Sequence, residues 1–306
     1  MLVKEVRDKL LQLCKKYGDS VVFDHPLCDH STISIGGKAA AWYVPFSLDG
    51  LCRTKTFLDD SGIRTIPMGN GSNILIPDEG LDAVVINLSG TIFKEIKIEG
   101  NTAVAGAGAK LGTLVSNCCT KGLAGLEGLI GIPATVGGAL VTNAAYRSAI
   151  SERLSRVLVL SEGAKAEWVE KKDIQFGYRF SSIDRGEIIL QAVFQLDEAN
   201  PDELKKKLKH YFFEKMEKQP LTRKTLGCIF KNPTEEKHPS GRLIEEVSMK
   251  GYRSGAAEVS EKHANFIINT GGASSRDVTN LMDEIRVKVR DKFSIELETE
   301  IEVLGA

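Results

Sequence analysis

The spacing of apolar residues predicts a helix at the start of the chain and short strands after it. Leu2, Val6, Leu10 and Leu13 recur every three or four positions, which is typical of one face of an amphipathic helix over residues 2–17. Short apolar runs between glycine-bearing turns indicate a helix over 111–119 and strands at 40–45, 64–68, 83–88, 155–160, 165–169 and 187–196. Gly100-Asn101 separates the runs 92–99 and 102–105 and predicts a hairpin there.

A polar stretch containing a proline, residues 197–202, marks the clearest domain boundary. A basic amphipathic helix is predicted after it, over 202–218. We therefore divide the chain into residues 1–200, with subdomains of about 1–88 and 89–200, and residues 201–306. A last helix begins after Ser274-Ser275, which are plausible caps, and its apolar face carries Val278, Leu281, Met282, Ile285 and Val289.

The C-terminal segment alternates strictly between apolar and acidic residues. The face expected to be buried carries Ile295, Leu297, Thr299, Ile301 and Val303, and the other carries Glu296, Glu298, Glu300 and Glu302. Alternation of this kind predicts one strand with a single buried face, because successive side chains of a strand point to opposite sides. The acidic face is typical of a solvated surface, although any one carboxylate can also serve a cleft.

Composition excludes several classes of protein. The 306 residues carry 40 Lys+Arg and 41 Asp+Glu, a formal charge of −1, so the basic excess typical of nucleic-acid binding is missing. No apolar run approaches the ~18 residues of a membrane span, and the charged N-terminus lacks the apolar core of a signal peptide. We expect a cytoplasmic protein without a nucleic-acid or membrane partner. Six cysteines without a C-x-x-C pair and five scattered histidines predict no metal site.

Two glycine-rich segments are candidates for a ligand site. Residues 67–75 contain Gly69-Asn70-Gly71-Ser72-Asn73, where consecutive N–H groups can form an anion-binding concavity; a simple hairpin turn is the alternative. Residues 125–139 contain five glycines and little charge, which suits either a phosphate-bearing ligand or a tight crossover between strands. A third segment, 104–112, is spaced G-x-G-x-x-x-G and not G-x-G-x-x-G, so we exclude a Rossmann dinucleotide site.

Seven motifs in fixed order carry a resemblance to a known family. They are residues 30–37 (HSTISIGG), 69–75 (GNGSNIL), 131–138 (GIPATVGG), 176–179 (FGYR), 227–233 (GCIFKNP), 259–266 (VSEKHANF) and 297–301 (LETEI). Together they resemble the UDP-N-acetylenolpyruvoylglucosamine reductases, flavoenzymes that complete UDP-N-acetylmuramate for peptidoglycan. The likeness spans about residues 20 to 305. Cys228 follows Arg179 by 49 positions, a spacing similar to the shorter, second type of this family.

The resemblance implies an α+β fold of the vanillyl-alcohol-oxidase type. Residues 1–200 would form an FAD-binding region of two subdomains, and 201–306 an α+β substrate-binding domain. It also implies non-covalent FAD, NADPH as co-substrate, a UDP-sugar substrate and a monomer. The positions that match FAD contacts are Gly69, Asn70, Gly71, Ser72, Asn73, Gly131, Ile132, Pro133, Thr135, Gly137, Gly138 and Asn143. The family's longer Asn-Ala-Gly-Ala-Tyr-Gly run is shortened here at 143–146, where the chain departs from the pattern.

The family reaction sends hydride from reduced flavin to an enolpyruvyl β-carbon and a proton to the α-carbon. Arg179 matches the arginine that stabilises the substrate carboxylate, a suitable task for a permanently charged guanidinium. Cys228 matches the proton donor, which is most often serine; a thiol, with an ordinary pKa near 8.5, is the stronger acid. Glu300 matches the active-site carboxylate, with Glu298 as the second choice because alternation alone does not separate them.

Substrate contacts are implied for four more positions, namely Tyr178, Lys218, Lys231 and Asn232. For each lysine a solvated surface position is the alternative. Two rival functions remain at this stage: a flavin oxidase of an alcohol or sugar with the same fold, and a non-catalytic nucleotide-sugar-binding protein. Neither requires a proton donor at Cys228.

Overall fold

The computed structural model describes residues 2–233 and 238–305, and these form two compact units. Unit 1 comprises the chain up to His25 together with Ala39–Asn70 and Asp82–Phe213. Unit 2 comprises Pro26–Lys38, Gly71–Leu81 and the chain from Glu214 onwards. The sequence placed a boundary after residue 200, whereas the structure places it after Phe213, within helix α5 (Pro201–Lys218).

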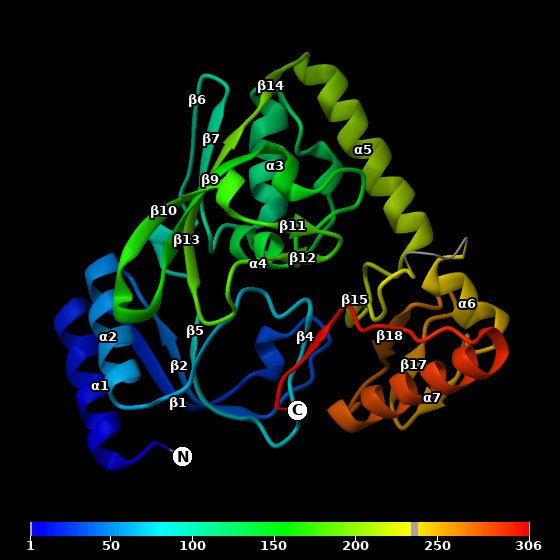
Figure 1. Ribbon diagram of the computed structural model, residues 1–306, viewed down its shortest axis with the longest axis horizontal. Coiled ribbons are helices and arrows are strands. Elements are labelled where there is room, and N and C mark those ends of the chain that lie inside the picture. Colours follow the sequence, from blue (N-terminus) through cyan, green and yellow to red (C-terminus); the bar gives the residue numbers. More distant parts are fainter. Residues whose placement is uncertain (1, 234–237, 306) are drawn as a thin grey trace. The chain divides into compact units, whose positions relative to one another are not determined.

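The N-terminal part of unit 1 is a small sheet with two helices alongside it (Figure 1). The strands lie in the order β1-β2-β5-β3, and β3 and β5 pair in parallel. Their bounds are β1 Ser20–Pro26, β2 Lys38–Val44, β3 Thr65–Pro67 and β5 Leu81–Ile86, and the helices are α1 (Lys4–Tyr17) and α2 (Leu48–Asp60). The predicted first helix is confirmed, and Gly18 ends it in the left-handed conformation that glycine adopts without strain.

The rest of unit 1 is built on a five-stranded sheet in the order β10-β9-β13-β7-β6, whose neighbours all pair antiparallel. Its strands are β6 Ile96–Glu99, β7 Thr102–Gly106, β9 Leu154–Leu160, β10 Ala166–Glu170 and β13 Ile188–Gln195. Helices α3 (Leu111–Thr120) and α4 (Val136–Val141) share its apolar core. Two short pairs complete the unit's strands: β8 (Leu123–Ala124) pairs with β14 (Asp197–Glu198), and β11 (Phe176–Gly177) pairs with β12 (Phe180–Ser181).

The predicted hairpin around Gly100-Asn101 is confirmed as β6 and β7, but its first strand is shorter than expected. Residues Thr91–Lys94 form a 3₁₀ turn instead of the start of that strand. This turn brings Phe93 into the core, where it is 4% exposed, and closes with a hydrogen bond from its N–H to the carbonyl of Gly90 (3.1 Å). Burial of one large aromatic side chain therefore outweighs the loose alternation of residues 92–95.

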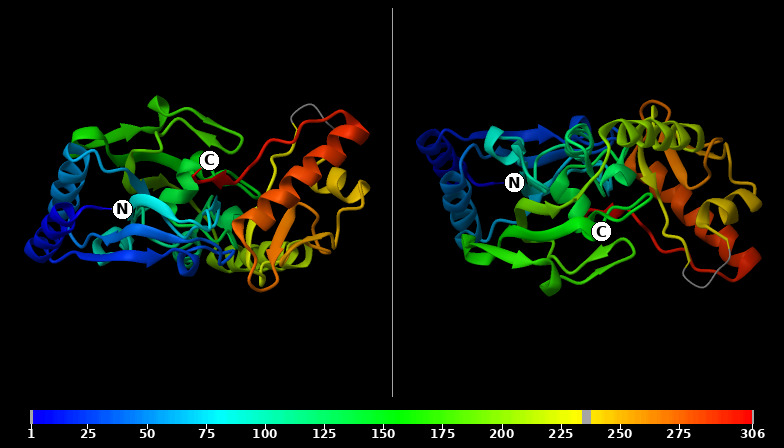
Figure 2. Two further views of the ribbon diagram at one scale, coloured as in Figure 1. Left: turned by 90° about the horizontal axis from the view of Figure 1, so that it is seen from below. Right: turned by 90° about the horizontal axis from the view of Figure 1, so that it is seen from above.

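Unit 2 has a four-stranded sheet in the order β15-β18-β17-β16. Its strands are β15 Thr225–Cys228, β16 Arg253–Ser254, β17 Ala257–Val259 and β18 Phe266–Asn269, and its helices are α6 (Ser240–Glu246) and α7 (Ser275–Phe293). Figures 1 and 2 show α7 alongside β16 and β17, and its buried face is the predicted set of five apolar residues. Ser274 caps α7 in a capping box with Asp277, as the sequence indicated.

Two short segments from the first third of the chain belong to unit 2, which the sequence did not predict. Ile33, Ile35 and Leu75 are buried in its core. The Asn269 amide donates to the carbonyl of Ile33 (2.9 Å), and the Thr32 hydroxyl donates to the carbonyl of Thr225 (2.7 Å). The division predicted from local composition did not include these two segments, because composition carries no record of such distant contacts.

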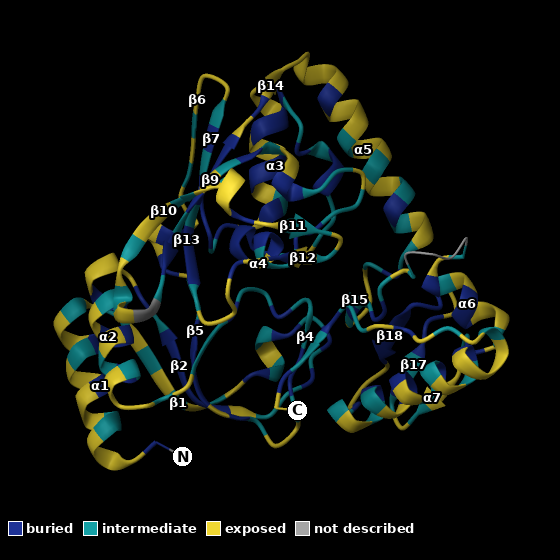
Figure 3. Cartoon of the chain, viewed as in Figure 1, coloured by how far each residue is buried: buried dark blue, intermediate teal, exposed yellow. Residues whose placement is uncertain are grey.

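The C-terminal segment keeps its alternating burial without forming the single predicted strand. Leu297 and Ile301 are buried, whereas Glu296 and Glu298 are exposed. Only Glu302–Val303 (β19) pairs in a ladder, in parallel with β4 (Ile74–Leu75), and Thr299 makes one isolated bridge to Phe230. The backbone changes partner along this segment, so no continuous ladder forms. Figure 3 shows a related contrast between elements, with α5 largely exposed and strands β2 and β13 largely buried.

Candidate active site

The first glycine loop is held tightly against the second within unit 1. A side chain at Gly69 would come within 2.4 Å of the Thr135 hydroxyl, so only glycine allows this approach. The Asn70 amide donates to the carbonyl of Pro133 (3.1 Å). The Asn87 amide donates to the carbonyl of Met68 (2.8 Å) and fixes the start of the loop from the neighbouring strand end. The two predicted glycine-rich segments therefore pack directly against each other.

The second glycine loop leads into the short helix α4. Thr135 is its N-cap, and its hydroxyl accepts from the N–H of Gly138 (3.2 Å). A side chain at Gly137 would lie 2.9 Å from the Ala107 methyl group, so the helix start packs closely on the strand-to-helix connection before α3. Beside it, a cavity of about 470 Å³ is lined by Lys110, Thr113 and Ser116 and by three predicted cofactor residues, Asn70, Ile132 and Pro133.

Asn143 and Arg179 lie together in unit 1, and both have a left-handed backbone (φ 44° and 54°). Arg179 sits at the tip of the β11–β12 hairpin, where its guanidinium donates to the carbonyl of Ala145 (3.0 Å) and lies 5.6 Å from the centre of the Tyr178 ring. The Asn143 amide donates to the carbonyl of Gly177 (2.8 Å). Non-glycine residues with positive φ are uncommon and often mark functional sites. The shortened 143–146 segment thus directly supports the arginine hairpin.

The side-chain carboxamide oxygen (Oδ1) of Asn143 is a buried acceptor with no hydrogen-bond partner among the described residues. Asn143 is only 7% exposed. An unmet buried acceptor is costly, so native structures almost always satisfy such an atom. This side-chain oxygen, just after the end of α4, is suited to a hydrogen-bond donor supplied by a bound ligand.

The rest of the first glycine motif, Gly71–Asn73, belongs to unit 2 and runs beside the C-terminal segment. The Asn73 amide donates to the carbonyl of Glu300 (3.1 Å), and the Glu302 N–H donates to the carbonyl of Asn73 (2.9 Å). Gly71 has φ 57°, and a side chain there would meet the carbonyl of His30 at 2.3 Å. The loop after Ser72 therefore continues as the support for Glu300.

Cys228 and Glu300 lie on adjacent extended segments of unit 2. The Glu300 N–H donates to the carbonyl of Ile229 (2.8 Å), and Phe230 bridges Thr299. Cys228 is half-buried at the end of β15, after a break in the β15–β18 register and after Gly227, whose φ is 82°. Such a bulge redirects the next side chain. The structure therefore brings together two of the three predicted catalytic residues, while Arg179 belongs to unit 1.

The predicted substrate residues of unit 2 also make structural contacts. The Lys231 ammonium is 3.3 Å from the Glu298 carboxylate, whose side chain is 78% exposed. The Asn232 carboxamide oxygen accepts from the N–H of Ser240 at the start of α6 (3.0 Å). Lys218 lies 2.7 Å from Glu214 on the last turn of α5. Glu298 therefore serves a surface ion pair, while the less exposed Glu300 lies beside the Cys228 segment.

Both parts of the chain are similar to known proteins. Residues 219–304 match the family described as UDP-N-acetylenolpyruvoylglucosamine reductase, C-terminal domain, and residues 39–165 match an FAD binding domain. UDP-N-acetylenolpyruvoylglucosamine reductase 1 from Bacillus cereus is 38% identical, over 93% of this chain and 95% of its own. The Bacillus subtilis reductase is 34% identical, over 97% and 99%. The chain belongs to the UDP-N-acetylenolpyruvoylglucosamine reductase family.

Solved structures confirm the predicted fold class. The crystal structure of the reductase from Thermus caldophilus superposes with a TM-score of 0.80 at 35% identity, covering 93% of this chain and 98% of that one. Wild-type Phl p 4.0202, a glucose dehydrogenase, shares the fold alone, with a TM-score of 0.50 at 14% identity over 65% of this chain and 45% of that one. Among the described residues, no helix is both long enough and apolar enough to span a membrane.

The chain is an FAD-containing oxidoreductase of this family, and its residues fit the cofactor. A cavity beside the interlocked glycine loops, lined in part by Asn70, Ile132 and Pro133, offers space for a ligand. The unmet Asn143 acceptor suits a donor on a flavin ring, which carries N–H groups. Sequence reasoning did not find Asn73 and Asn265 as supports of the catalytic segments, because a single asparagine in a motif does not show what it contacts.

Proposed function

We propose that this protein reduces UDP-N-acetylglucosamine-enolpyruvate to UDP-N-acetylmuramate for peptidoglycan synthesis, with NADPH as the reductant, and that it acts as a monomer. The enolpyruvyl C=C bond is reduced: the β-carbon gains a hydride, the α-carbon gains a proton, and NADPH is oxidised to NADP⁺. FAD, when bound, supplies hydride transfer between NADPH and the substrate. The observation that carries the proposal is the backbone hydrogen bond from Glu300 to Ile229, the residue after Cys228, in the part of the chain that matches the family's C-terminal domain.

Arg179 is assigned to the substrate carboxylate. Charge develops on this carboxylate as hydride reaches the β-carbon, and a positioned cation stabilises it more in the transition state than in the ground state. The hydrogen bond to the carbonyl of Ala145 and the stacking on Tyr178 fix the guanidinium before substrate arrives. Tyr178, 49% exposed at the hairpin tip, is placed to contact the substrate.

Cys228 is assigned as the general acid. Its thiol gives a proton to the α-carbon as the C–H bond forms, and the thiolate that remains regains a proton from solvent. Glu300, whose backbone is bonded to Ile229, orients the reacting group next to this thiol. Lys231 and Asn232 follow on the same segment, and with Lys218 they are assigned to the diphosphate-sugar, for which a compact cation is suited.

The test separates the two half-reactions. Anaerobic protein is reduced with NADPH and then mixed with UDP-N-acetylglucosamine-enolpyruvate while the flavin's visible absorbance is followed. We expect Cys228→Ala to bleach normally with NADPH but to be reoxidised by substrate about 100- to 10,000-fold more slowly, which is the range for loss of a general acid. Cys228→Ser should keep appreciable activity because its hydroxyl can also donate.

Two results would contradict the proposal. Near-normal turnover in Cys228→Ala would remove this thiol from the mechanism. Reoxidation by oxygen but not by the enolpyruvyl substrate in the unsubstituted protein would instead favour a flavin oxidase with the same fold.

A further inference from the structure

The segment that carries Cys228 is held by one buried side chain on another element of unit 2. Asn265 is 3% exposed and precedes β18. Its carboxamide oxygen accepts from the N–H of Phe230 (2.9 Å), and its carboxamide nitrogen donates to the carbonyl of the same residue (2.8 Å). The side chain therefore meets both backbone groups of Phe230 as a neighbouring strand would.

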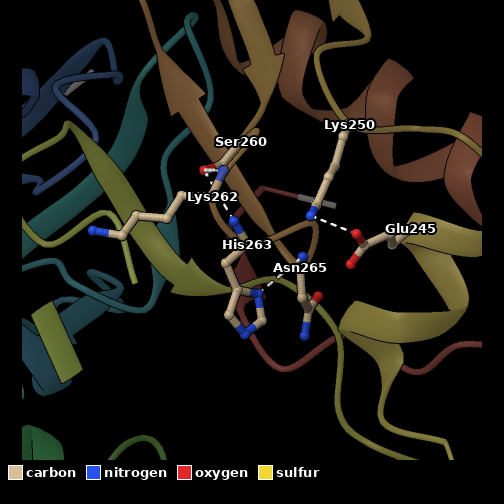
Figure 4. Close-up of polar contacts among 6 residues, drawn as sticks. All are labelled: Glu245, Lys250, Ser260, Lys262, His263 and Asn265. Carbon is tan, nitrogen blue, oxygen red and sulfur yellow. Dashed lines mark hydrogen bonds and ion pairs between the residues drawn. The ribbon is translucent and has the colours of Figure 1, made fainter. Parts of the chain in front are cut away.

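The Asn265 backbone adds a third bond to the same segment, because its carbonyl accepts from the N–H of Ile229 (2.9 Å). Its own N–H donates to the Nδ1 atom of His263 (3.3 Å), and Figure 4 shows this imidazole beside Asn265. Ser260 fixes the preceding turn, since its hydroxyl accepts from the N–H groups of Lys262 (3.2 Å) and His263 (3.4 Å). Asn265 is thus placed by a turn whose polar groups are satisfied locally.

The opposite edge of the Cys228 segment contacts the C-terminal chain. The Lys231 N–H donates to the carbonyl of Glu298, and the Glu300 N–H donates to the carbonyl of Ile229, each at 2.8 Å. Residues 228–231 therefore lie between Asn265 on one side and the segment bearing Glu300 on the other. β15 and β18 pair at Cys228 and Phe266 but lose register toward Thr225, so the ladder alone does not fix this end of the segment.

We propose that Asn265 is a positioning residue for the reaction: its bidentate contact with Phe230 sets the place of the Cys228 thiol and, through the same segment, of Lys231 and Glu300. This inference rests on the proposed function only for the role of Cys228; the contact itself is geometric. A carboxamide suits the task because it offers one acceptor and one donor on a single rigid plane, matching a backbone N–H and C=O. Misplacement of a reacting group by about 1 Å is enough to cost about a hundredfold in rate.

Asn269 offers a matched control. It is also a buried asparagine (6% exposed), it lies at the other end of β18, and both ends of its carboxamide bond backbone. Its partners are the carbonyl of Ile33 (2.9 Å) and the N–H groups of Gly271 (2.9 Å) and Ala273 (3.1 Å), away from the Cys228 segment. Asn265→Ala and Asn269→Ala therefore remove chemically similar contacts, and only the first touches the donor segment.

The kinetic test compares both variants in the two half-reactions. We expect Asn265→Ala to slow reoxidation by the enolpyruvyl substrate about 10- to 100-fold and to leave reduction by NADPH unchanged. Asn269→Ala should change reoxidation by less than about threefold. In a Cys228→Ala background, Asn265→Ala should add less than its own full loss in reoxidation, because one of the groups it positions is gone. Equal losses in both half-reactions, or full additivity with Cys228→Ala, would show a merely structural role and overturn the proposal.

A second measurement does not depend on turnover. The holoprotein is treated with iodoacetamide, and alkylation of the peptide containing Cys228 is followed by mass spectrometry. We expect Asn265→Ala to alkylate Cys228 several-fold faster than either the unsubstituted protein or Asn269→Ala. Burial raises the pKa of Cys118 and of Cys119 to about 12, so these thiols serve as slow internal references.

Unchanged alkylation in Asn265→Ala would refute the positioning role even if the reductase assignment holds. If the unsubstituted protein fails to reduce the enolpyruvyl substrate, the proposed function fails, and the alkylation rates still decide the role of Asn265. Where Asn265→Ala does not fold, Asn265→Asp replaces it. Its carboxylate keeps the acceptor for the Phe230 N–H but loses the donor to the Phe230 carbonyl. We again expect slower reoxidation by substrate and faster alkylation of Cys228.

Discussion

At the scale of single residues, the polar groups on the Asn265 side of the donor segment satisfy one another locally. His263 is the clearest case: burial lowers the pKa of its imidazole below the ordinary 6.5. The neutral ring can accept at Nδ1 from the N–H of Asn265 and pack edge-on against Phe266, with 4.8 Å between ring centres. Protonation at Nδ1 would replace this acceptor with a donor facing an N–H.

This arrangement predicts a pH dependence of stability. The folded state binds a proton at His263 less readily than the unfolded chain does. The neutral imidazole therefore makes its full contribution to the free energy of unfolding above pH 6.5, and this contribution is lost as the pH falls through the lowered pKa. We expect the free energy of unfolding, measured with urea at pH 7.5 and at pH values below 6.5, to fall less in His263→Gln, which cannot titrate. Identical pH profiles for the two proteins would contradict this assignment.

The residue scale also shows what the sequence could not determine. Motif order brought Arg179, Cys228 and Glu300 to attention, but Glu298 and Glu300 share one face of the alternating pattern and differ only in their neighbours. In the structure, Glu298 is 78% exposed and pairs with Lys231, whereas the Glu300 backbone is bonded to Ile229 and Asn73. A contact between residues more than two hundred positions apart leaves no local pattern in the sequence.

At the scale of elements, periodicity predicted helices α1, α3, α5 and α7 to within about two residues but missed helix α2. Helix α7 has the expected buried face and cap because both depend on residues three or four apart. The C-terminal segment has the expected burial but not the expected strand, because burial follows from local alternation while pairing depends on which chain lies alongside. The 3₁₀ turn at Thr91–Lys94 was missed for the same reason, since Phe93 packs on distant strands.

The bulge before Cys228 gives a prediction at this scale. Gly227 has φ 82° and nothing within 4 Å of the position of a Cβ atom, so an alanine there meets backbone strain and no clash. We expect Gly227→Ala to destabilise the protein by about 1–2 kcal/mol and to slow reoxidation by substrate, because relief of the strain shifts Cys228. The measurements are urea unfolding and the substrate half-reaction.

Gly100→Ala is the matched control, since Gly100 also has positive φ (55°) and open space around it, at the tip of the β6–β7 hairpin. It should show a similar loss of stability with unchanged reoxidation. Equal kinetic effects in the two variants would mean that the bulge has no special role in placing the thiol.

At the scale of the whole molecule, the two units were only partly visible in the sequence. Composition marked the polar stretch at 197–202, but Pro26–Lys38 and Gly71–Leu81 join unit 2 through core packing of Ile33, Ile35 and Leu75. The first glycine motif is consequently divided, with Gly69 and Asn70 in unit 1 and Gly71 onwards in unit 2. Gly69 and Asn70 therefore pack against the second glycine loop in unit 1, whereas Asn73 of the same motif supports the Glu300 segment in unit 2.

Cofactor binding is expected to stabilise the whole protein. FAD binds the folded state, so at a hundredfold excess over its Kd it should add about 2.7 kcal/mol to the free energy of unfolding. The side-chain oxygen of Asn143 is one of the buried polar atoms without a partner among the described residues, and a flavin donor would satisfy it. We expect Asn143→Ala to weaken FAD binding about tenfold, as for loss of one buried hydrogen bond, and to reduce the rise in Tm on adding FAD to the apoprotein.

Asn269→Ala separates this effect from general destabilisation, because it removes buried hydrogen bonds in unit 2 and none from the glycine loops. It should lower the Tm of the apoprotein while FAD titrations, followed by flavin fluorescence, give an unchanged Kd. If Asn143→Ala bound FAD as tightly as the unsubstituted protein, the unmet acceptor would have no part in cofactor binding. The short 143–146 segment would then serve only the Arg179 hairpin, to which Asn143 and Ala145 each contribute one hydrogen bond.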